Sequence, residues 1–277
     1  MTQHQLTLDG QAVYYYVLHP ERRRVILMVH GFRGNHAGLL GIAERLPEYK
    51  IIIPDLPGCG ATPPLPPGGG SHDIDGYAGW VRRFSAELGL QRFVLMGHSY
   101  GALIAAKVAA DDPAGIERLV LVNPVSTSSR TLALIGLGFY RLGLALPEPL
   151  CRRLLWSRTL NRAQSWLMMK TRDPALRRRI YAHHLADLAV PFRRPVIAEA
   201  AESVMRKTVL SYAAQITTPT LLIGGGRDDL APLPAQRQLQ KLIPGSQLVT
   251  IPEVGHLTHL ETPAKVAETM RTYLIQP

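Results

Sequence analysis

The chain has 277 residues, 46% of them hydrophobic, which is enough to bury a core and to form one domain with an insertion. Its net charge is +10, but aromatic residues make up only 6% of it and no nucleic-acid-binding motif is present, so we expect no nucleic-acid partner. Its two cysteines, Cys59 and Cys151, are too few to require a disulfide framework, and no apolar run is long enough to span a bilayer.

Near the N-terminus, residues 6–16 predict a β-hairpin with its turn at Asp9-Gly10, a pair that readily adopts the backbone angles of a tight turn. Residues 1–17 lack a basic segment followed by an apolar one, which is the pattern of a secretion signal. We therefore expect a cytoplasmic location.

Short apolar runs alternate with helix-like segments between about residues 25 and 123, which predicts parallel β-α-β units. The predicted strands cover residues 25–29, 50–54, 92–96 and 117–123. Before the third strand, the proline- and glycine-rich residues 63–71 predict a surface loop, and residues 73–90 predict an amphipathic helix.

A serine flanked by glycines, in the run Gly97-His98-Ser99-Tyr100-Gly101, joins the third strand to an alanine-rich helix over residues 102–110. A turn this sharp lifts the hydroxyl of Ser99 clear of the sheet. The glycines are needed because a Cβ atom at either position would collide with the neighbouring strand or helix. The pattern predicts a nucleophile, provided that a base, an acid and an oxyanion site lie elsewhere in the chain.

Helix-like segments replace the alternation from about residue 124 to residue 212. We predict that residues 125–212 form a helical cap and that residues 1–124 and 213–277 form the core domain. Residues 125–210 hold 15 Lys and Arg against 5 Asp and Glu, whereas the rest of the chain holds 16 of each. The whole charge surplus therefore belongs to the predicted cap.

This surplus has two interpretations, and both stay open. The cap can bind an anionic partner, such as a membrane surface or a substrate with a phosphate or carboxylate group. Alternatively, its arginines simply face water on helices that cover the core. The apolar residues 132–146 beside these charges could form a lid helix that lies on a membrane or lines an acyl pocket.

Two polar residues follow the last predicted strands. Residues 219–223 lead into a glycine-rich turn and Asp228, and residues 248–251 lead into a loop with Gly255 and His256. Ser99, Asp228 and His256 therefore occur in the chain order of an α/β-hydrolase triad.

With these motifs, the chain resembles the α/β-hydrolase superfamily from residue 25 to about residue 274, apart from the variable middle segment. The resemblance implies a mostly parallel, doubly wound sheet with a helical cap inserted after the sixth strand. It also implies that Ser99 is the nucleophile, that His256 is its base and that Asp228 orients the histidine. The loop His30-Gly31-Phe32-Arg33-Gly34 resembles the family's oxyanion loop, so we expect the amides of Phe32 and Tyr100 to bind the oxyanion.

Other residues could compete for these roles. Asp229 is adjacent to Asp228, but the spacing from Gly225 to Pro232 is closer to the family pattern with Asp228 as the acid. We expect His259 to pack or face solvent, His98 to be structural and His30 to shape the oxyanion loop. Cys59 we interpret as a tolerated substitution in a turn.

The cap also contains candidate substrate contacts and two further histidines. Its candidate lining residues are Trp156, Trp166, Met168 and Met169, for each of which ordinary packing is the alternative. His183 and His184 are adjacent on a predicted helix and are not expected to share a face. No cysteine and histidine cluster has metal-ligand spacing, so we expect no metal and no cofactor.

These residues favour a serine hydrolase that cleaves a small-molecule carboxylic ester with an apolar acyl or aryl part. One alternative is a carbon–carbon bond hydrolase or lyase on a carboxylated metabolite. Two departures weaken it: enzymes resembling the family's menaquinone-pathway synthase have an arginine where this chain has Leu103, and carbon–carbon hydrolases often have a tryptophan soon after the catalytic histidine, which residues 257–260 lack. Another alternative is a non-catalytic binding protein of the same fold. The oligomeric state stays open.

Overall fold

The computed structural model describes residues 1–126, 130–189 and 193–276, and for residues 130–137 it describes the backbone alone. In these residues the strands form one eight-stranded sheet in the order β1-β2-β4-β3-β5-β6-β7-β8. The strands are β1 (Thr2–Leu8), β2 (Gln11–Leu18), β3 (Val25–Val29), β4 (Lys50–Pro54), β5 (Phe93–His98), β6 (Ile116–Val122), β7 (Thr220–Gly225) and β8 (Gln247–Ile251).

The strand directions match the predicted topology. β2 pairs antiparallel with β1 and with β4, while all neighbours from β4 to β8 are parallel. Parallel neighbours need long crossover connections, which here are mostly helices. The predicted mostly parallel, doubly wound sheet is confirmed.

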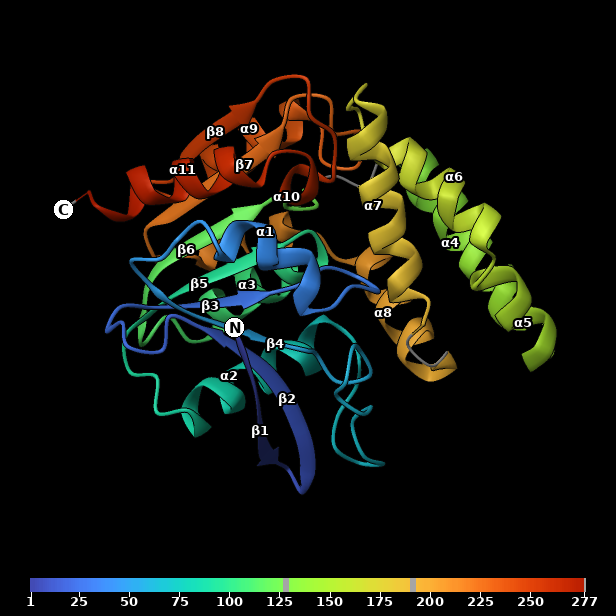
Figure 1. The fold of residues 1–277 in the computed structure, drawn as a ribbon, viewed down its shortest axis with the longest axis horizontal. Coiled ribbons are helices and arrows are strands. Elements are labelled where there is room, and N and C mark those ends of the chain that lie inside the picture. Colours follow the sequence, from blue (N-terminus) through green and yellow to red (C-terminus); the bar gives the residue numbers. More distant parts are fainter. Residues whose placement is uncertain (127–129, 190–192, 277) are drawn as a thin grey trace.

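Helices cover both faces of this sheet (Figure 1). One core layer includes α2 (Ile74–Glu87), α3 (Tyr100–Asp111) and α9 (Leu233–Leu242), and the other includes α1 (Leu40–Ala43) and α11 (Pro263–Leu274). Leu27 and Val29 of β3 pack into the first layer, whereas Ile26 and Met28 pack into the second. A strand that is buried on both faces needs apolar side chains at every position, which explains the uninterrupted apolar runs in the sequence.

Some predicted elements end at different residues in the structure. α2 ends at Glu87 rather than at residue 90, because Gly89 has a φ of +65°, a left-handed conformation in which helices commonly stop. α3 begins at Tyr100, directly after Ser99, so the amide of Tyr100 lies at the N-terminus of that helix.

The described residues between β6 and β7 form five α-helices, which confirms the predicted helical insertion after the sixth strand. They are α4 (Arg130–Ala145), α5 (Glu148–Leu155), α6 (Arg158–Met168), α7 (Pro174–Asp187) and α8 (Arg194–Arg206). Figure 1 shows α4, α5 and α6 as the outermost of these helices, with α7 and α8 nearer the sheet. The apolar residues 132–146 fall mostly on α4, where the side chains of residues 132–137 lie outside the described ones. The domain boundaries at residues 124 and 212 stay a prediction.

Candidate active site

The turn at Ser99 has a strained backbone. Ser99 has a φ of +53° and a ψ of −114°, a conformation that is unfavourable for a residue with a side chain. A Cβ atom at Gly97 would lie 2.1 Å from the carbonyl oxygen of Gly101, and one at Gly101 would lie 2.2 Å from that of Val29. The two glycines therefore allow β3, β5 and α3 to approach closely enough to hold this turn.

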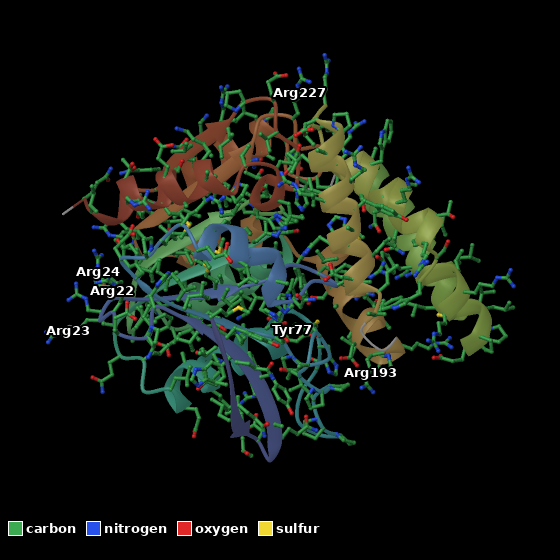
Figure 2. The ribbon with its side chains drawn as sticks, in the orientation of Figure 1. Arg22, Arg23, Arg24, Tyr77, Arg193 and Arg227 are labelled. Atoms are coloured by element: carbon green, nitrogen blue, oxygen red, sulfur yellow. The ribbon has the colours of Figure 1, made fainter. Side chains whose placement is uncertain are left out.

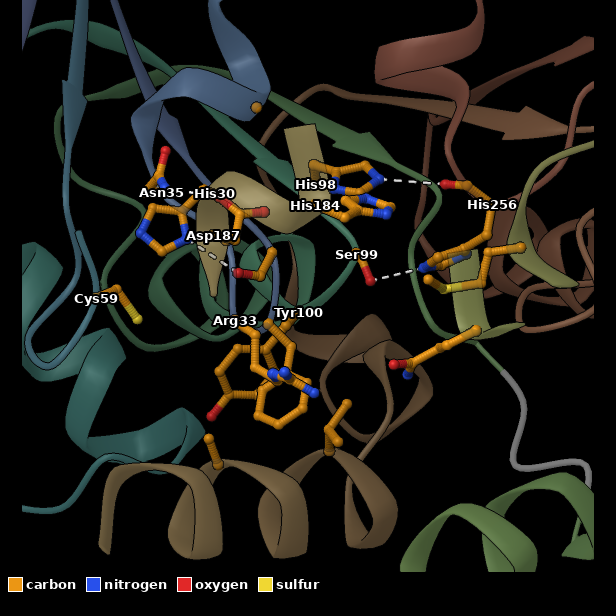
Figure 3. A pocket seen from close by; sticks show the side chains of 18 of the residues that line it. His30, Arg33, Asn35, Cys59, His98, Ser99, Tyr100, His184, Asp187 and His256 are labelled. Atoms are coloured by element: carbon orange, nitrogen blue, oxygen red, sulfur yellow. Dashed lines mark hydrogen bonds between the residues drawn. The ribbon is translucent and has the colours of Figure 1, made fainter. Parts of the chain in front are cut away.

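Three side chains from three separate loops meet at the carboxyl edge of the sheet. Ser99 Oγ lies 2.7 Å from His256 Nε2, and His256 Nδ1 lies 2.8 Å from Asp228 Oδ2. Figure 3 shows the first of these hydrogen bonds. Both His256 and Asp228 are buried. The structure thus brings together, in one hydrogen-bonded line, the three residues that the sequence analysis selected.

Asp228 is held by several hydrogen bonds besides the one from His256. Its Oδ1 accepts from the amides of Leu230 and Ala231 at 2.8 and 3.0 Å, and Asn123 Nδ2 donates to its Oδ2 at 2.8 Å. Burial alone would raise the pKa of Asp228, but the adjacent His256 and these donors lower it to about 2. The carboxylate is therefore ionised at neutral pH and can stabilise a protonated imidazole.

The neighbouring carboxylate occupies a different environment. Asp229 is exposed and forms an ion pair with Lys170 at 2.6 Å. It therefore lies outside the line of Ser99, His256 and Asp228.

The predicted oxyanion donors lie beside the nucleophile. A Cβ atom at Gly31 would lie 3.5 Å from Ser99 Cβ, so the loop that carries Phe32 passes next to the serine. Within the described part of the chain, the amide of Phe32 donates no hydrogen bond to another group. The amide of Tyr100 is in the first turn of α3, where amides have no partner inside the helix. Both amides can therefore donate to an oxyanion, which stays a prediction.

His30 holds the start of this loop. Its Nδ1 donates to the carbonyl oxygen of Gly31 at 2.9 Å, and its Nε2 accepts from the amide of Leu56 at 3.1 Å. An imidazole that accepts at one nitrogen is neutral, and burial lowers the pKa of His30 accordingly. These contacts agree with a role in shaping the loop.

Two further histidines pack behind His256. The rings of His98 and His259 lie 3.7 Å apart between centroids, and His98 Nε2 lies 3.3 Å from the carbonyl oxygen of His256 (Figure 3). Burial, followed by the nearby His256, lowers the pKa of His98 to about 3. His98 is therefore neutral at physiological pH and packs against His256.

His183 and His184 point in different directions from α7, as adjacent helical residues are expected to, and His184 Nδ1 lies 2.6 Å from Ser165 Oγ of α6. Both side chains of α7 border the same cavity, with 6.0 Å between the ring centroids. Adjacent helical residues point about 100° apart. Both can reach the cavity because it extends around the edge of α7.

A cavity of about 440 Å³ lies between Ser99 and the inserted helices. Trp156 and Met168 line it as predicted, but Trp166 and Met169 do not. Trp166 is 61% exposed on the outer side of α6, and Met169 is buried in a separate cluster with Ile180. Trp166 lies two residues before Met168 on α6 and therefore points to the other side of the helix. Met169 turns away from the cavity because α6 ends at Met168 and the chain is extended at Met169.

Cys59 lies on the wall of the cavity. Burial, aided by nearby carboxylates, raises the pKa of its thiol to about 12. A protonated thiol is a poor nucleophile, so Cys59 is not a second reactive centre at neutral pH.

Several residues that hold the site from outside were not among the predicted site residues. Asn123, which donates to Asp228, has a φ of +48° at the end of β6. An asparagine directly after a buried strand could have been recognised, because asparagine tolerates this conformation better than most residues. Arg33 and Asn35 bind partners that are distant in the sequence, so no local pattern marks these contacts. Glu261 belongs to a run after His256 that resembles the family's histidine loop, but its partners in the insert are also distant.

The described residues contain no cluster of three or more histidine, cysteine or acidic side chains arranged to hold a metal ion. None of the helices described combines the length and hydropathy needed to cross a bilayer.

Comparisons with known proteins agree with this fold. The sequence model of a family described as the alpha/beta hydrolase fold matches residues 24–263. The chain is 28% identical over 264 residues to the Klebsiella pneumoniae protein named "Putative carbamate hydrolase RutD", covering 90% of this chain and 89% of that protein. An esterase from Exiguobacterium antarcticum superposes with a TM-score of 0.80 at 20% identity, over 100% of both chains. A hydrolase from Pseudomonas aeruginosa has a TM-score of 0.81 at 20% identity, over 99% of both chains. At these identities the two structures show a shared fold alone.

Proposed function

The chain belongs to the alpha/beta hydrolase fold family, and from this premise we propose that it is a serine hydrolase of carboxylic esters with an apolar acyl or aryl part. The observation that carries the proposal is the hydrogen-bonded line of Ser99, His256 and Asp228 beside a largely apolar cavity.

The reaction proceeds in two halves. His256 Nε2 takes the proton of Ser99 as Oγ bonds to the ester carbonyl carbon, and the amides of Phe32 and Tyr100 donate to the oxyanion. His256 then gives this proton to the leaving alcohol as the carbon–oxygen bond of the ester breaks. Water, activated by the same imidazole, attacks the acyl-enzyme and releases the acid and the free serine. Asp228 remains ionised and stabilises the imidazolium in both halves.

The cavity wall supports an apolar acyl or aryl group. Its apolar and aromatic side chains include Phe32, Tyr77, Tyr100, Tyr140, Trp156, Met168, Val196, Ile197, Val204 and Leu257. The guanidinium of Arg33 also lies on this wall, but it is already bonded to Asn161 and packed against Trp156. This engagement disfavours Arg33 as the partner of a substrate carboxylate, whereas Arg193, which is exposed, also lines the cavity and keeps the carbon–carbon hydrolase as the alternative.

A panel of aryl esters of graded acyl length, with and without a terminal carboxylate, tests the proposal, with Ser99→Ala as the blank. We expect the unmodified protein to hydrolyse the neutral esters and Ser99→Ala to be inactive. Turnover of dienone acids in place of esters would support carbon–carbon cleavage. A fluorophosphonate probe should label Ser99, whereas no adduct would indicate a non-catalytic binding protein.

The basic insert supports a second proposal, that this protein contacts anionic membrane surfaces. On α6, Arg158 and Arg162 are exposed together with Leu160 and Trp166, which combines positive charge with apolar side chains that could enter a headgroup layer. The alternative is that these arginines are only solvated.

Vesicle sedimentation separates these alternatives. Replacing Arg158 and Arg162 by glutamine should weaken binding to anionic vesicles at low salt. Replacing Arg22 and Arg23, which lie on the side opposite the insert (Figure 2), should not. Equal binding to neutral vesicles, or binding to neither, would reject membrane contact through charge.

A further inference from the structure

The helical insert is bonded directly to the loop that carries His256. The amide of His256 donates to the carbonyl oxygen of Met168, the last residue of α6, at 3.0 Å. A Cβ atom at Gly255 would lie 2.3 Å from the same oxygen, so the two backbones are in contact. The end of α6 is therefore part of the structure that places the imidazole.

A buried carboxylate closes this contact. Glu261 Oε1 accepts from the amide of Gly255 at 3.0 Å, and its Oε2 accepts from the amides of Lys170 and Thr171 at 2.9 and 2.6 Å. Glu261 is only 8% exposed. Hydrogen bonds from backbone amides to an ionised group are short and strong. We name Glu261 and these three amides the histidine-loop clamp, because it joins the insert to the residue before His256.

A second contact joins the insert to the oxyanion loop. Arg33 directly follows Phe32 and has a left-handed φ of +58°. Its Nη2 donates to the carbonyl oxygen of Leu155 and to Asn161 Oδ1, both at 3.1 Å, and its guanidinium lies 4.5 Å from the centre of the Trp156 ring. We name Arg33 and these three partners the oxyanion-loop clamp.

The same loop is also tied to α7. Asn35 Nδ2 donates to Asp187 Oδ1 at 2.8 Å, and Figure 3 shows Asn35, Asp187 and Arg33 around the cavity. The oxyanion loop is thus bonded to the ends of α5 and α7 and to the first turn of α6.

We infer that Glu261 and Arg33 are positioning residues that fasten the insert to two loops of the active site, so that the insert is a fixed roof and not a lid that opens in each turnover. The inference rests on the proposed function, in which one of these loops carries the base, His256, and the other carries an oxyanion donor, the amide of Phe32. Loss of a clamp moves His256 or the amide of Phe32 relative to the reacting atoms. A displacement of about 1 Å lowers a rate by about 10²-fold.

Glu261→Gln tests the histidine-loop clamp. The amide side chain keeps its size but offers one acceptor oxygen in place of two, so it can satisfy only one side of the clamp. We expect kcat to fall by about 10- to 100-fold for an acetate ester and for a long-chain ester alike. The acetate ester is decisive, because its acyl group is too short to need the distant cavity wall.

Glu268→Gln is the matched control, since Glu268 is exposed and pairs with Lys265. A loss confined to the long-chain ester would mean that Glu261 only shapes the cavity. That result, or a Glu261→Gln variant as active as the control, would overturn the inference.

Arg33→Lys tests the oxyanion-loop clamp. Lysine keeps the charge but lacks the planar fork that reaches two acceptors and stacks on the indole. We expect a lower kcat for the acetate ester with little change in KM. Arg83→Lys, at an exposed ion pair with Asp9, is the control. An unchanged kcat in Arg33→Lys would contradict the clamp.

Amide hydrogen exchange on the unmodified protein gives a measurement that needs no variant to fold. A fixed roof predicts slow and closely similar exchange at Gly255, Lys170 and Thr171, because all three donate to one buried carboxylate. Fast exchange at Lys170 and Thr171 beside slow exchange at Gly255 would show an opening lid and overturn the inference. Absence of both ester hydrolysis and fluorophosphonate labelling would instead refute the proposed function.

Discussion

The sheet core and the helical insert differ in burial and in charge. The inner strands β3, β5, β6 and β7 are almost entirely buried, and the chain outside residues 125–210 carries equal numbers of acidic and basic residues. The insert carries the whole positive surplus and exposes Trp166 and Leu167. The core thus positions Ser99 and Asp228, while the insert forms the wall that a substrate meets. The two proposed clamps join these regions, because there the insert is hydrogen-bonded to the loops that carry His256 and Phe32.

The largest effect should come from the core residues that carry the reaction. Ser99→Ala or His256→Ala should lower kcat by roughly 10³- to 10⁶-fold, because either change removes the nucleophile or its base. Ester hydrolysis under saturating substrate measures this, and thermal unfolding checks that the variants fold. Retention of more than a tenth of the activity would refute the assignment.

The next largest effect should distinguish the two adjacent aspartates. Asp228→Asn should lower kcat by roughly 10⁴-fold, because an amide cannot stabilise the imidazolium and favours the wrong tautomer. Asp229→Asn, which breaks an exposed ion pair with Lys170, should stay within about twofold of the unmodified protein. The reverse order would make Asp229 the catalytic acid.

A smaller effect is expected from a substitution in the insert, which should change the choice between substrates and leave the rate of the chemical step unchanged. Val204 lines the cavity, so Val204→Phe should lower kcat/KM for a long-chain ester by about tenfold and leave an acetate ester unchanged. Trp166→Ala, on the outer side of α6, should change neither. If Val204→Phe lowers the activity on both esters equally, the side chain at position 204 does not select substrates by acyl length.

The smallest effect concerns stability in acid. Because the pKa of Asp228 is about 2 in the folded protein, below its ordinary value of 3.8, this group stabilises the fold above pH 4. That contribution, about 2 kcal/mol, is lost as the pH falls from about 4 to 2. Chemical denaturation at pH 5 and pH 2.5 should therefore show a larger loss for the unmodified protein than for Asp228→Asn. Equal losses would mean that the folded pKa of Asp228 is not lowered.

Much of the fold was predictable because its signals are local. The strand runs and the flanking glycines of Ser99 are visible in short windows of sequence, and the order of Ser99, Asp228 and His256 follows from comparing such windows along the chain. The insert was less predictable in detail. Met168 lines the cavity, but its neighbours Trp166 and Met169 do not. Trp166 points to the other side of α6, and Met169 turns away because the helix ends at Met168.

Local sequence by itself determined the strands, the glycine-flanked serine and the residue types that could react, because apolar periodicity and turn preferences act between near neighbours. Tertiary structure alone decided that the carboxylate of Glu261 meets two amides of the insert and that Arg33 reaches α5 and α6. Those partners are between 90 and 128 residues apart in the chain. Hydrogen bonds over such separations depend on how the whole chain packs, and no short pattern of residues encodes them.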